Sequence, residues 1–172
     1  MLKTLKGDLI SLAKDGNFDV IVHGCNCHCL QRAGIAYQMA EHFARDKYPQ
    51  EDVSYKGDIN KLGTIDIGVS YVKKDEAPIV YTANVFKQLP LERGFSKLSI
   101  INAYTQYFPG AQFDIHAFII CLKKINNLFT GLRIGLPKIG TGIGGGNVIE
   151  IYQAIQKYLS DCEVTIVEWN QT

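Results

Sequence analysis

Short runs of β-branched and other apolar residues alternate along the chain with longer segments in which apolar residues recur at helical spacing. Glycine, proline or polar clusters bound the short runs, as is typical of strands. Strands are expected at Leu2–Leu5, Val20–His23, Thr64–Tyr71, Ile79–Phe86, Leu98–Tyr104, Leu132–Leu136 and Val164–Val167. Helices are expected at Gly34–Ala44, Asp114–Leu128 and Val148–Leu159. This order predicts helices packed on a mixed, mainly parallel sheet.

Two connecting segments have a clear character. The charged stretch Lys73–Pro78 is expected to form the tip of a hairpin between Thr64–Tyr71 and Ile79–Phe86, because charged residues and proline suit an exposed turn. Leu89–Ser96 is expected to be a loop. With 172 residues, 47% of them hydrophobic, the chain can bury one sizeable core, and no internal repeat divides it. We therefore expect a single domain over residues 1–172.

The charge balance limits the kinds of partner. The formal net charge is +1, and lysine or arginine never occurs in a run longer than a pair. A broad basic face for a nucleic-acid backbone is therefore not expected, whereas a small anionic ligand fits. No apolar run approaches the roughly 18 residues needed to span a bilayer, and the first residues do not resemble a signal peptide. These features predict a soluble, cytoplasmic monomer with no membrane partner.

Three of the five cysteines, Cys25, Cys27 and Cys29, lie in one short segment beside His23 and His28. The cluster suggests zinc. However, its spacing is not that of paired zinc-binding cysteines, and the two other cysteines are isolated in apolar segments. An odd number of thiols without a secretion signal also argues against a disulfide framework. Reduced thiols, with no metal and no cofactor, are the favoured interpretation.

Residues 136–147, LPKIGTGIGGGN, are the most informative for function. A predicted strand ends here among five glycines, and a helical pattern follows. Such a backbone can turn sharply and direct its N–H groups at phosphate oxygens near a helix start. The run is neither a Walker A motif nor a dinucleotide fingerprint. It predicts a phosphate loop, with a glycine-rich turn that binds nothing as the alternative.

Two further runs place polar residues at the ends of predicted strands, where ligands of α/β sheets usually bind. The carboxamide of Asn26 could bind a sugar hydroxyl or could satisfy the backbone of its own loop. Gly34, at the start of the following helix, would let the backbone approach the same ligand. Asp8 follows the first strand, where a helix N-cap is the more common role of an aspartate.

These three runs, in this order, resemble the macro-domain family, and the resemblance covers essentially the whole chain. KGDLI resembles the family's first strand end, and HGCNCHCLQRAGIA resembles its asparagine loop and Gly-Ile/Val-Ala helix. INAYTQYFPG and LPKIGTGIGGGN resemble the central strand and the phosphate loop of the branch described as ADP-ribose-1″-phosphate processing. The resemblance implies a three-layer α/β/α fold with a mixed, mainly parallel central sheet, and ADP-ribose or a derivative as the ligand.

The resemblance also implies roles along the ligand. Asp8 would accept a hydrogen bond from the adenine amino group, Asn26 would hold the distal ribose, and the amides from Ile139 to Gly145 would wrap the diphosphate. The implied ligand-binding residues are Asp8, Leu9, Gly24, Gly34, Ile35, Tyr104, Ile139, Gly140, Thr141, Gly142, Ile143 and Gly144.

Aromatic residues would complete the site. By the resemblance, Tyr104 or Phe108 could cover the ligand from the far side. Trp169 follows the last strand and could lie against the adenine, although a tryptophan in such a place more often closes the core.

The sequence departs from the family pattern where catalysis is concerned. Many members carry Gly-Gly-Asp-Trp after the phosphate loop, whereas this chain has Asn147 at the aspartate position, and asparagine cannot act as a general base. Asn147 and Glu150 also suit the start of the last helix. His23 or His28 could supply the proton chemistry instead, with His23 preferred by the resemblance; a buried structural histidine is the alternative. Asn26 and His23 are therefore the candidate catalytic residues.

Three functions stay open at this stage. The chain could remove the terminal phosphate of ADP-ribose 1″-phosphate, for which His23 and Asn26 argue. It could be a reader that binds ADP-ribose without turnover, for which Asn147 argues. It could also hydrolyse ADP-ribosyl groups on protein or nucleic acid, although the near-neutral charge does not favour a nucleic-acid substrate.

Overall fold

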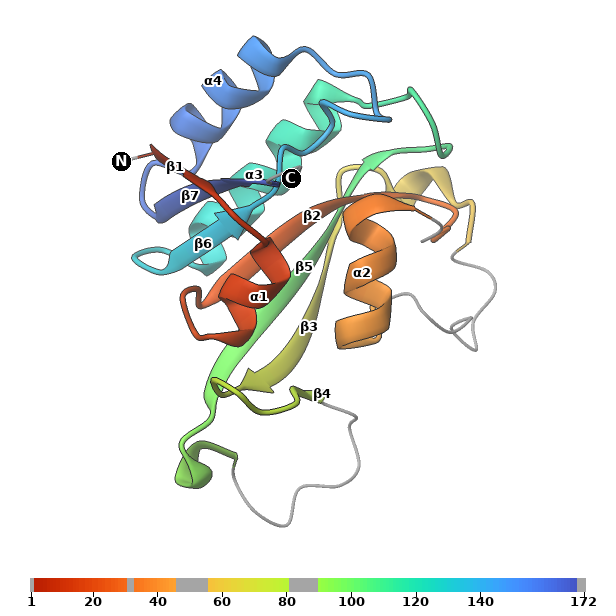
Figure 1. Cartoon of the computed structure of the whole chain (residues 1–172). Coiled ribbons are helices and arrows are strands. Elements are labelled where there is room, and N and C mark those ends of the chain that lie inside the picture. Colours follow the sequence, from red (N-terminus) through yellow and green to blue (C-terminus); the bar gives the residue numbers. More distant parts are fainter. Residues whose placement is uncertain (1, 31–32, 46–55, 81–89, 170–172) are drawn as a thin grey trace.

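The computed structural model describes residues 2–30, 33–45, 56–80 and 90–169. Seven strands form one sheet in the order β1-β7-β6-β2-β5-β3-β4 (Figure 1). The strands are β1 (Leu2–Lys6), β2 (Val20–Asn26), β3 (Ile65–Val72), β4 (Ile79–Val80), β5 (Ser96–Gln106), β6 (Arg133–Leu136) and β7 (Glu163–Glu168). The first five strands in this order pair in parallel. β3 pairs antiparallel with both of its neighbours, β5 and β4. The mixed, mainly parallel sheet is as predicted.

Helices cover both faces of this sheet. They are α1 (Leu9–Lys14), α2 (Gly34–Phe43), α3 (Ile115–Leu128) and α4 (Val148–Tyr158), with 3₁₀ turns η2 (Ile59–Lys61) and η3 (Pro90–Arg93). Buried residues of α3 and α4 share a core with alternate strand residues such as Val20 and Val22. Buried residues of α1 and α2 share the opposite core with Ile21. The alternation of side chains along a strand thus produces the three α/β/α layers.

Most of the predicted elements are present, with shifted ends. The hairpin tip at Lys73–Pro78 is confirmed, since β3 and β4 pair on either side of it. The predicted strand Ile79–Phe86 is described only as Ile79–Val80, because its remaining residues lie outside the described part of the chain. The loop predicted at Leu89–Ser96 contains η3 and the start of β5.

Helix α1 was not among the predicted helices. It has six residues, too few to show a helical period in the sequence. Asp8 begins it as the N-cap, because its Oδ1 accepts hydrogen bonds from the amides of Ile10 at 2.8 Å and Ser11 at 3.3 Å. The N-cap role considered for Asp8 is therefore confirmed. No helix in the described residues is both long enough and apolar enough to cross a bilayer.

Candidate functional site

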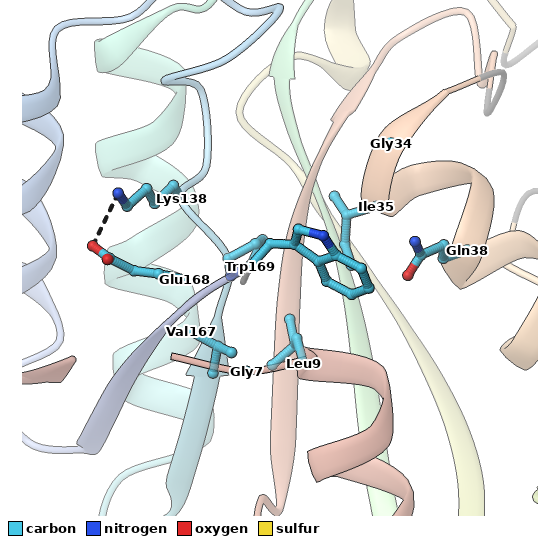
Figure 2. Close-up of a pocket in the computed structure, with 10 residues that line it drawn as sticks. Gly7, Leu9, Gly34, Ile35, Gln38, Lys138, Val167, Glu168 and Trp169 are labelled. Carbon is cyan, nitrogen blue, oxygen red and sulfur yellow. Dashed lines mark ion pairs between the residues drawn. The ribbon is translucent and has the colours of Figure 1, made fainter. Parts of the chain in front are cut away.

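A two-part cleft lies where the parallel strands end and α2 begins. One part has a volume of about 470 Å³ and is lined by the end of β7, the segments that follow β1, β6 and β7, the start of α1 and one side of α2 (Figure 2). The other part, of about 390 Å³, is lined by the ends of β2 and β5, the α2 start and the loop after β6. The two parts share Gly34, Ile35, Pro137 and Lys138. Ligands of α/β sheets usually bind at this edge.

The first part of the cleft has apolar walls, and we call it the apolar part. Leu9, Ile35 and Val167 form its apolar walls, and Gln38 adds a carboxamide one turn along α2. The indole of Trp169 lies across this part, near Leu9, Ile35 and Gln38 (Figure 2). Trp169 is 59% exposed, so it does not close the core. A flat aromatic ring with an apolar surround suits stacking of another flat ring.

The second part is formed largely by backbone of the loop between β6 and α4. Its lining includes Ile139, Gly140, Gly142, Ile143 and Gly144. Within the loop, the amide of Gly146 donates to the carbonyl oxygen of Gly140 at 2.6 Å, and the amide of Gly145 donates to that of Gly142 at 3.1 Å. No described residue accepts a hydrogen bond from the amides of Gly140, Gly142, Ile143 or Gly144. Such a row of amides can bind an anion.

A neighbouring loop holds the glycine loop in place. The amide of Phe113 donates to the carbonyl oxygen of Gly144 at 3.0 Å. The carboxamide of Gln106, at the end of β5, donates to the carbonyl oxygens of Phe108 at 2.8 Å and Gly110 at 3.0 Å. Gln106 and Gly110 also line the second part of the cleft. The glycine loop is therefore held in place by the chain that follows β5.

Asn26 lines the second part, but most of its carboxamide is used by its own turn. Its Oδ1 accepts hydrogen bonds from the amides of His28 at 3.1 Å and Leu30 at 3.2 Å, and its Nδ2 donates to the carbonyl oxygen of Leu30 at 3.1 Å. The loop-organising alternative considered for Asn26 is thus present in the structure. Of its two Nδ2 hydrogens, one is used in these contacts with described residues.

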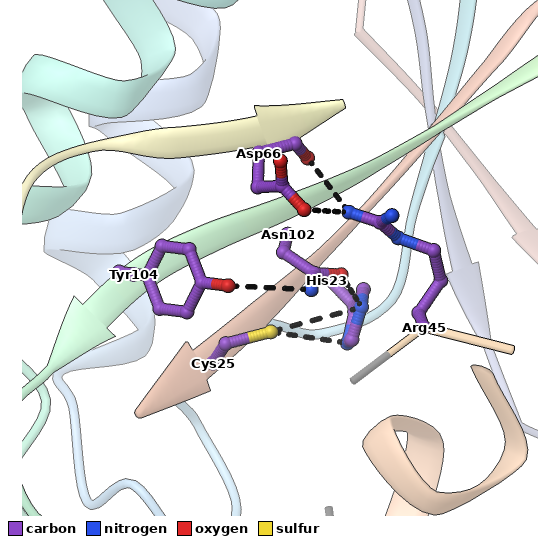
Figure 3. Close-up of polar contacts among 6 residues, drawn as sticks. All are labelled: His23, Cys25, Arg45, Asp66, Asn102 and Tyr104. Carbon is purple, nitrogen blue, oxygen red and sulfur yellow. Dashed lines mark hydrogen bonds and ion pairs between the residues drawn. The ribbon is translucent and has the colours of Figure 1, made fainter. Parts of the chain in front are cut away.

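His23 was expected beside the distal end of the cleft, and the structure places it elsewhere. Its side chain is fully buried and lines neither part of the cleft. Its Nε2 lies 2.6 Å from Oδ1 of Asn102, and Sγ of Cys25 lies 3.7 Å from both ring nitrogens (Figure 3). The reason is that side chains two positions apart on a strand point to the same face. His23 therefore projects to the same face as Ile21, which is the face covered by α2.

Tyr104 belongs to the same buried group, so its ring does not cover the cleft as was expected. It is 1% exposed and forms a small core with Cys25 and Cys27. Phe108, the other candidate cover, is exposed and stacks on His28 with ring centroids 5.1 Å apart. Neither aromatic ring lines the cleft.

The remaining predicted site residues divide into two groups. Leu9, Gly24, Gly34, Ile35, Ile139, Gly140, Gly142, Ile143 and Gly144 line the cleft. Asp8 and Thr141 do not line it; the carboxylate of Asp8 caps α1, and the Thr141 hydroxyl donates to the carbonyl oxygen of Lys138 at 3.0 Å. Asn147 caps α4 through its Oδ1. The described residues contain no group of three or more histidine, cysteine or acidic side chains that could hold a metal ion.

Sequence reasoning missed three polar residues of the first part. Lys138 was not among the predicted site residues, yet it lines both parts of the cleft. Glu168 forms an ion pair with it at 3.0 Å between Nζ and Oε1. Gln38 follows Gly34 by four residues on α2, a spacing that places both on one side of the helix and could have identified it.

Comparison with known proteins agrees with this architecture. No model of a known protein family matches the chain. It is 29% identical over 173 aligned positions to an uncharacterised 17.5 kDa protein of Enterobacteria phage T4. The alignment covers 98% of this chain and 97% of that protein. The macrodomain of Mycobacterium tuberculosis DarG superimposes with a TM-score of 0.59 at 22% identity, over 97% of both chains. The chain has the macrodomain fold.

A second solved structure with this fold contains a ligand. It is that of Thermosipho africanus DarTG in complex with ADP-ribose, with a TM-score of 0.62 and 14% identity. The match covers 99% of this chain and 42% of that one. At this level of identity the match supports the macrodomain fold alone.

The burial of His23 is expected to make the stability of the protein depend on pH. Burial lowers the pKa of His23 from 6.5 to about 4, opposed by its hydrogen bond to Asn102 and aided by the charge of Arg45. Between these two values the unfolded chain binds a proton at His23 and the folded chain does not. The folded state should therefore lose about 3 kcal/mol of stability from this group as pH falls from 7 to 4.

Urea unfolding at several pH values tests this expectation. His23→Gln should reduce the loss between pH 7 and pH 4, whatever it does to stability at pH 7. His116→Gln, which changes an exposed histidine on α3, is the matched control and should follow the wild type. Parallel curves for wild type and His23→Gln would show that His23 does not carry this dependence.

Proposed function

We propose that this macrodomain binds ADP-ribose in the two-part cleft. The adenine would lie against Trp169 in the apolar part, and the diphosphate would bind the amides of Gly140, Gly142, Ile143 and Gly144. The distal ribose would then reach toward Asn26 and the start of α2. The observation that carries the proposal is the row of amides without a described acceptor beside an apolar pocket with an exposed indole. The ADP-ribose complex of DarTG supports it.

The chemical groups of the ligand fit the two parts of the cleft. ADP-ribose joins an apolar base through a ribose to an anionic diphosphate and a second ribose. The two parts of the cleft are continuous through their shared residues, and the glycine loop and Asn26 both line the second part, so one extended ligand could occupy both parts. Backbone amides suit the diphosphate because they donate hydrogen bonds at fixed positions and need no rearrangement.

Removal of the terminal phosphate of ADP-ribose 1″-phosphate is the second candidate function. Asn26 favours it, because its second Nδ2 hydrogen could orient a ribose hydroxyl or a water molecule at the reacting end. Against it, the described residues that line this part include no carboxylate or imidazole; their titratable side chains are Cys25 and Lys138. None of the described residues that line this part is thus suited to act as a general base, and Asn147 cannot supply one. Binding is the better supported function.

Phosphorus NMR with near-stoichiometric protein separates the two functions. With ADP-ribose 1″-phosphate, binding should shift or broaden the diphosphate lines while the substrate stays intact for hours. Growth of an inorganic phosphate line that Asn26→Ala abolishes would instead establish hydrolysis. Intact substrate would leave cleavage of ADP-ribosyl groups from protein or nucleic acid to be tested separately.

Two asparagine variants test the role of Asn26 in ADP-ribose binding. Asn26→Ala should weaken ADP-ribose binding about tenfold or more, as expected for loss of a hydrogen bond and of an ordered turn. Asn60→Ala changes an exposed asparagine in η2 that does not line the cleft and should bind as the wild type does. Diphosphate lines that wild-type protein leaves unperturbed would overturn the ADP-ribose proposal.

A further inference from the structure

An ion pair stands at the junction of the two parts of the cleft. Nζ of Lys138 lies 3.0 Å from Oε1 of Glu168, with side chains 46% and 26% exposed. Glu168 lines the apolar part, and Lys138 lines both parts (Figure 2). Exposed ion pairs contribute little to stability, so stability does not explain why this pair lies inside a binding cleft.

The carboxylate of Glu168 is held in a defined place. Glu168 ends β7, and its carbonyl oxygen accepts a hydrogen bond from the amide of Gly7 at 2.9 Å, which ties it to the end of β1. The hydroxyl of Tyr152 on α4 lies 3.5 Å from the same Oε1 that pairs with Lys138. Among the described residues both side-chain contacts use Oε1, which leaves Oε2 available to a ligand.

The chemistry of the proposed ligand places one particular group at this junction. In ADP-ribose a ribose connects the adenine to the diphosphate. With the adenine in the apolar part and the diphosphate at the amide loop, this adenosine ribose must pass the shared residues, and Lys138 is one of them. Carboxylate oxygens accept hydrogen bonds from sugar hydroxyls, and an acidic residue placed at a ribose repels a phosphate on that hydroxyl.

We propose that the Lys138–Glu168 pair makes the cleft selective for an adenosine ribose with free hydroxyls over one that carries a 2′-phosphate. Glu168 accepts a hydrogen bond from a hydroxyl of this ribose, and Lys138 holds the carboxylate in place. The inference deepens the proposed function and rests on it. The ligands selected against are 2′-phosphorylated forms of ADP-ribose.

Lys138 also determines what happens to the selectivity when Glu168 is replaced. The Lys138 ammonium group is charged at neutral pH, and its contact with Glu168 raises its pKa further. While Glu168 is present, that charge is neutralised by its partner. Without the carboxylate, the ammonium would be free to pair with an added phosphate.

Isothermal titration calorimetry with ADP-ribose and 2′-phospho-ADP-ribose tests the proposal. Wild type should bind ADP-ribose at least about tenfold more tightly, a ratio typical of like-charge exclusion in a binding site. Glu168→Gln should reduce this ratio about tenfold or reverse it, through tighter binding of the 2′-phosphorylated ligand. Lys138→Met should keep the preference, because the carboxylate remains.

Glu163→Gln is the matched control. It removes the same charge from the same strand, at the exposed end of β7 away from the cleft, and should keep the wild-type ratio. Equal affinities of wild type for the two ligands, or an unchanged ratio in Glu168→Gln, would overturn the selectivity. Failure of wild type to bind either ligand would overturn ADP-ribose binding itself, so the two failures are distinguishable.

Discussion

Replacing Gly140 by alanine is expected to abolish ADP-ribose binding and to lower the free energy of unfolding by about 3 kcal/mol. Gly140 has φ +73°, a backbone conformation that costs a residue with a side chain about 1–2 kcal/mol. A methyl group there would also overlap the ring of Phe113, and the Phe113 amide is hydrogen-bonded to Gly144. The loop would have to change its shape, and the row of amides would be lost with it.

Gly142→Ala is the matched control for the stability measurement. A Cβ at Gly142 meets nothing within 4 Å, so its free energy of unfolding should stay within about 0.5 kcal/mol of the wild type. Urea unfolding and calorimetric titration with ADP-ribose would be measured for both variants. If Gly140→Ala kept wild-type stability and affinity, the loop geometry described above would not be what forms the binding site.

Trp169→Ala should weaken ADP-ribose binding by roughly tenfold to a hundredfold, the range expected when a base loses an aromatic stacking partner. The indole lies in the apolar part of the cleft and is 59% exposed. Its removal should therefore change the free energy of unfolding little, by about 0.5 kcal/mol or less. Trp169→Phe, which keeps an aromatic face, should retain most of the affinity.

Fluorescence gives an independent measurement of the same contact. Trp169 is the single tryptophan in the sequence, so its emission reports this position alone. Titration with ADP-ribose or with AMP should change the emission, whereas ribose 5-phosphate, which has no base, should not. An unchanged affinity in Trp169→Ala would mean that the adenine does not stack on this residue.

The elements of the sheet were predictable because their signal is local. β2 and β7 each contain a run of β-branched residues, and α3 has apolar residues at helical spacing over 14 residues. α1 was not predicted, because six residues give too short a period to recognise. The glycine run after β6 was also visible in the sequence, since glycine is the residue that such a tight, ligand-approaching backbone requires.

The candidate site was predictable only in part. The backbone of the glycine loop and of the start of α2 lines the cleft as expected. These positions were predictable because the sequence shows where each strand ends and the next helix begins. The side chains were harder to predict. His23 is buried beneath α2, and Lys138 and Glu168 form their pair across 30 positions of sequence. No local pattern reports such a contact.

The sequence by itself determined the α/β layering, the end of the sheet at which the cleft lies and the glycine loop that lines it. The tertiary structure decided which side chains line the cleft. Neighbouring residues of a strand face opposite sides of the sheet. Which of the two sides carries the cleft depends on the packing of α2 and on the strand order. For that reason His23 and Tyr104 are core residues here, whereas Trp169, Lys138 and Glu168 line the cleft.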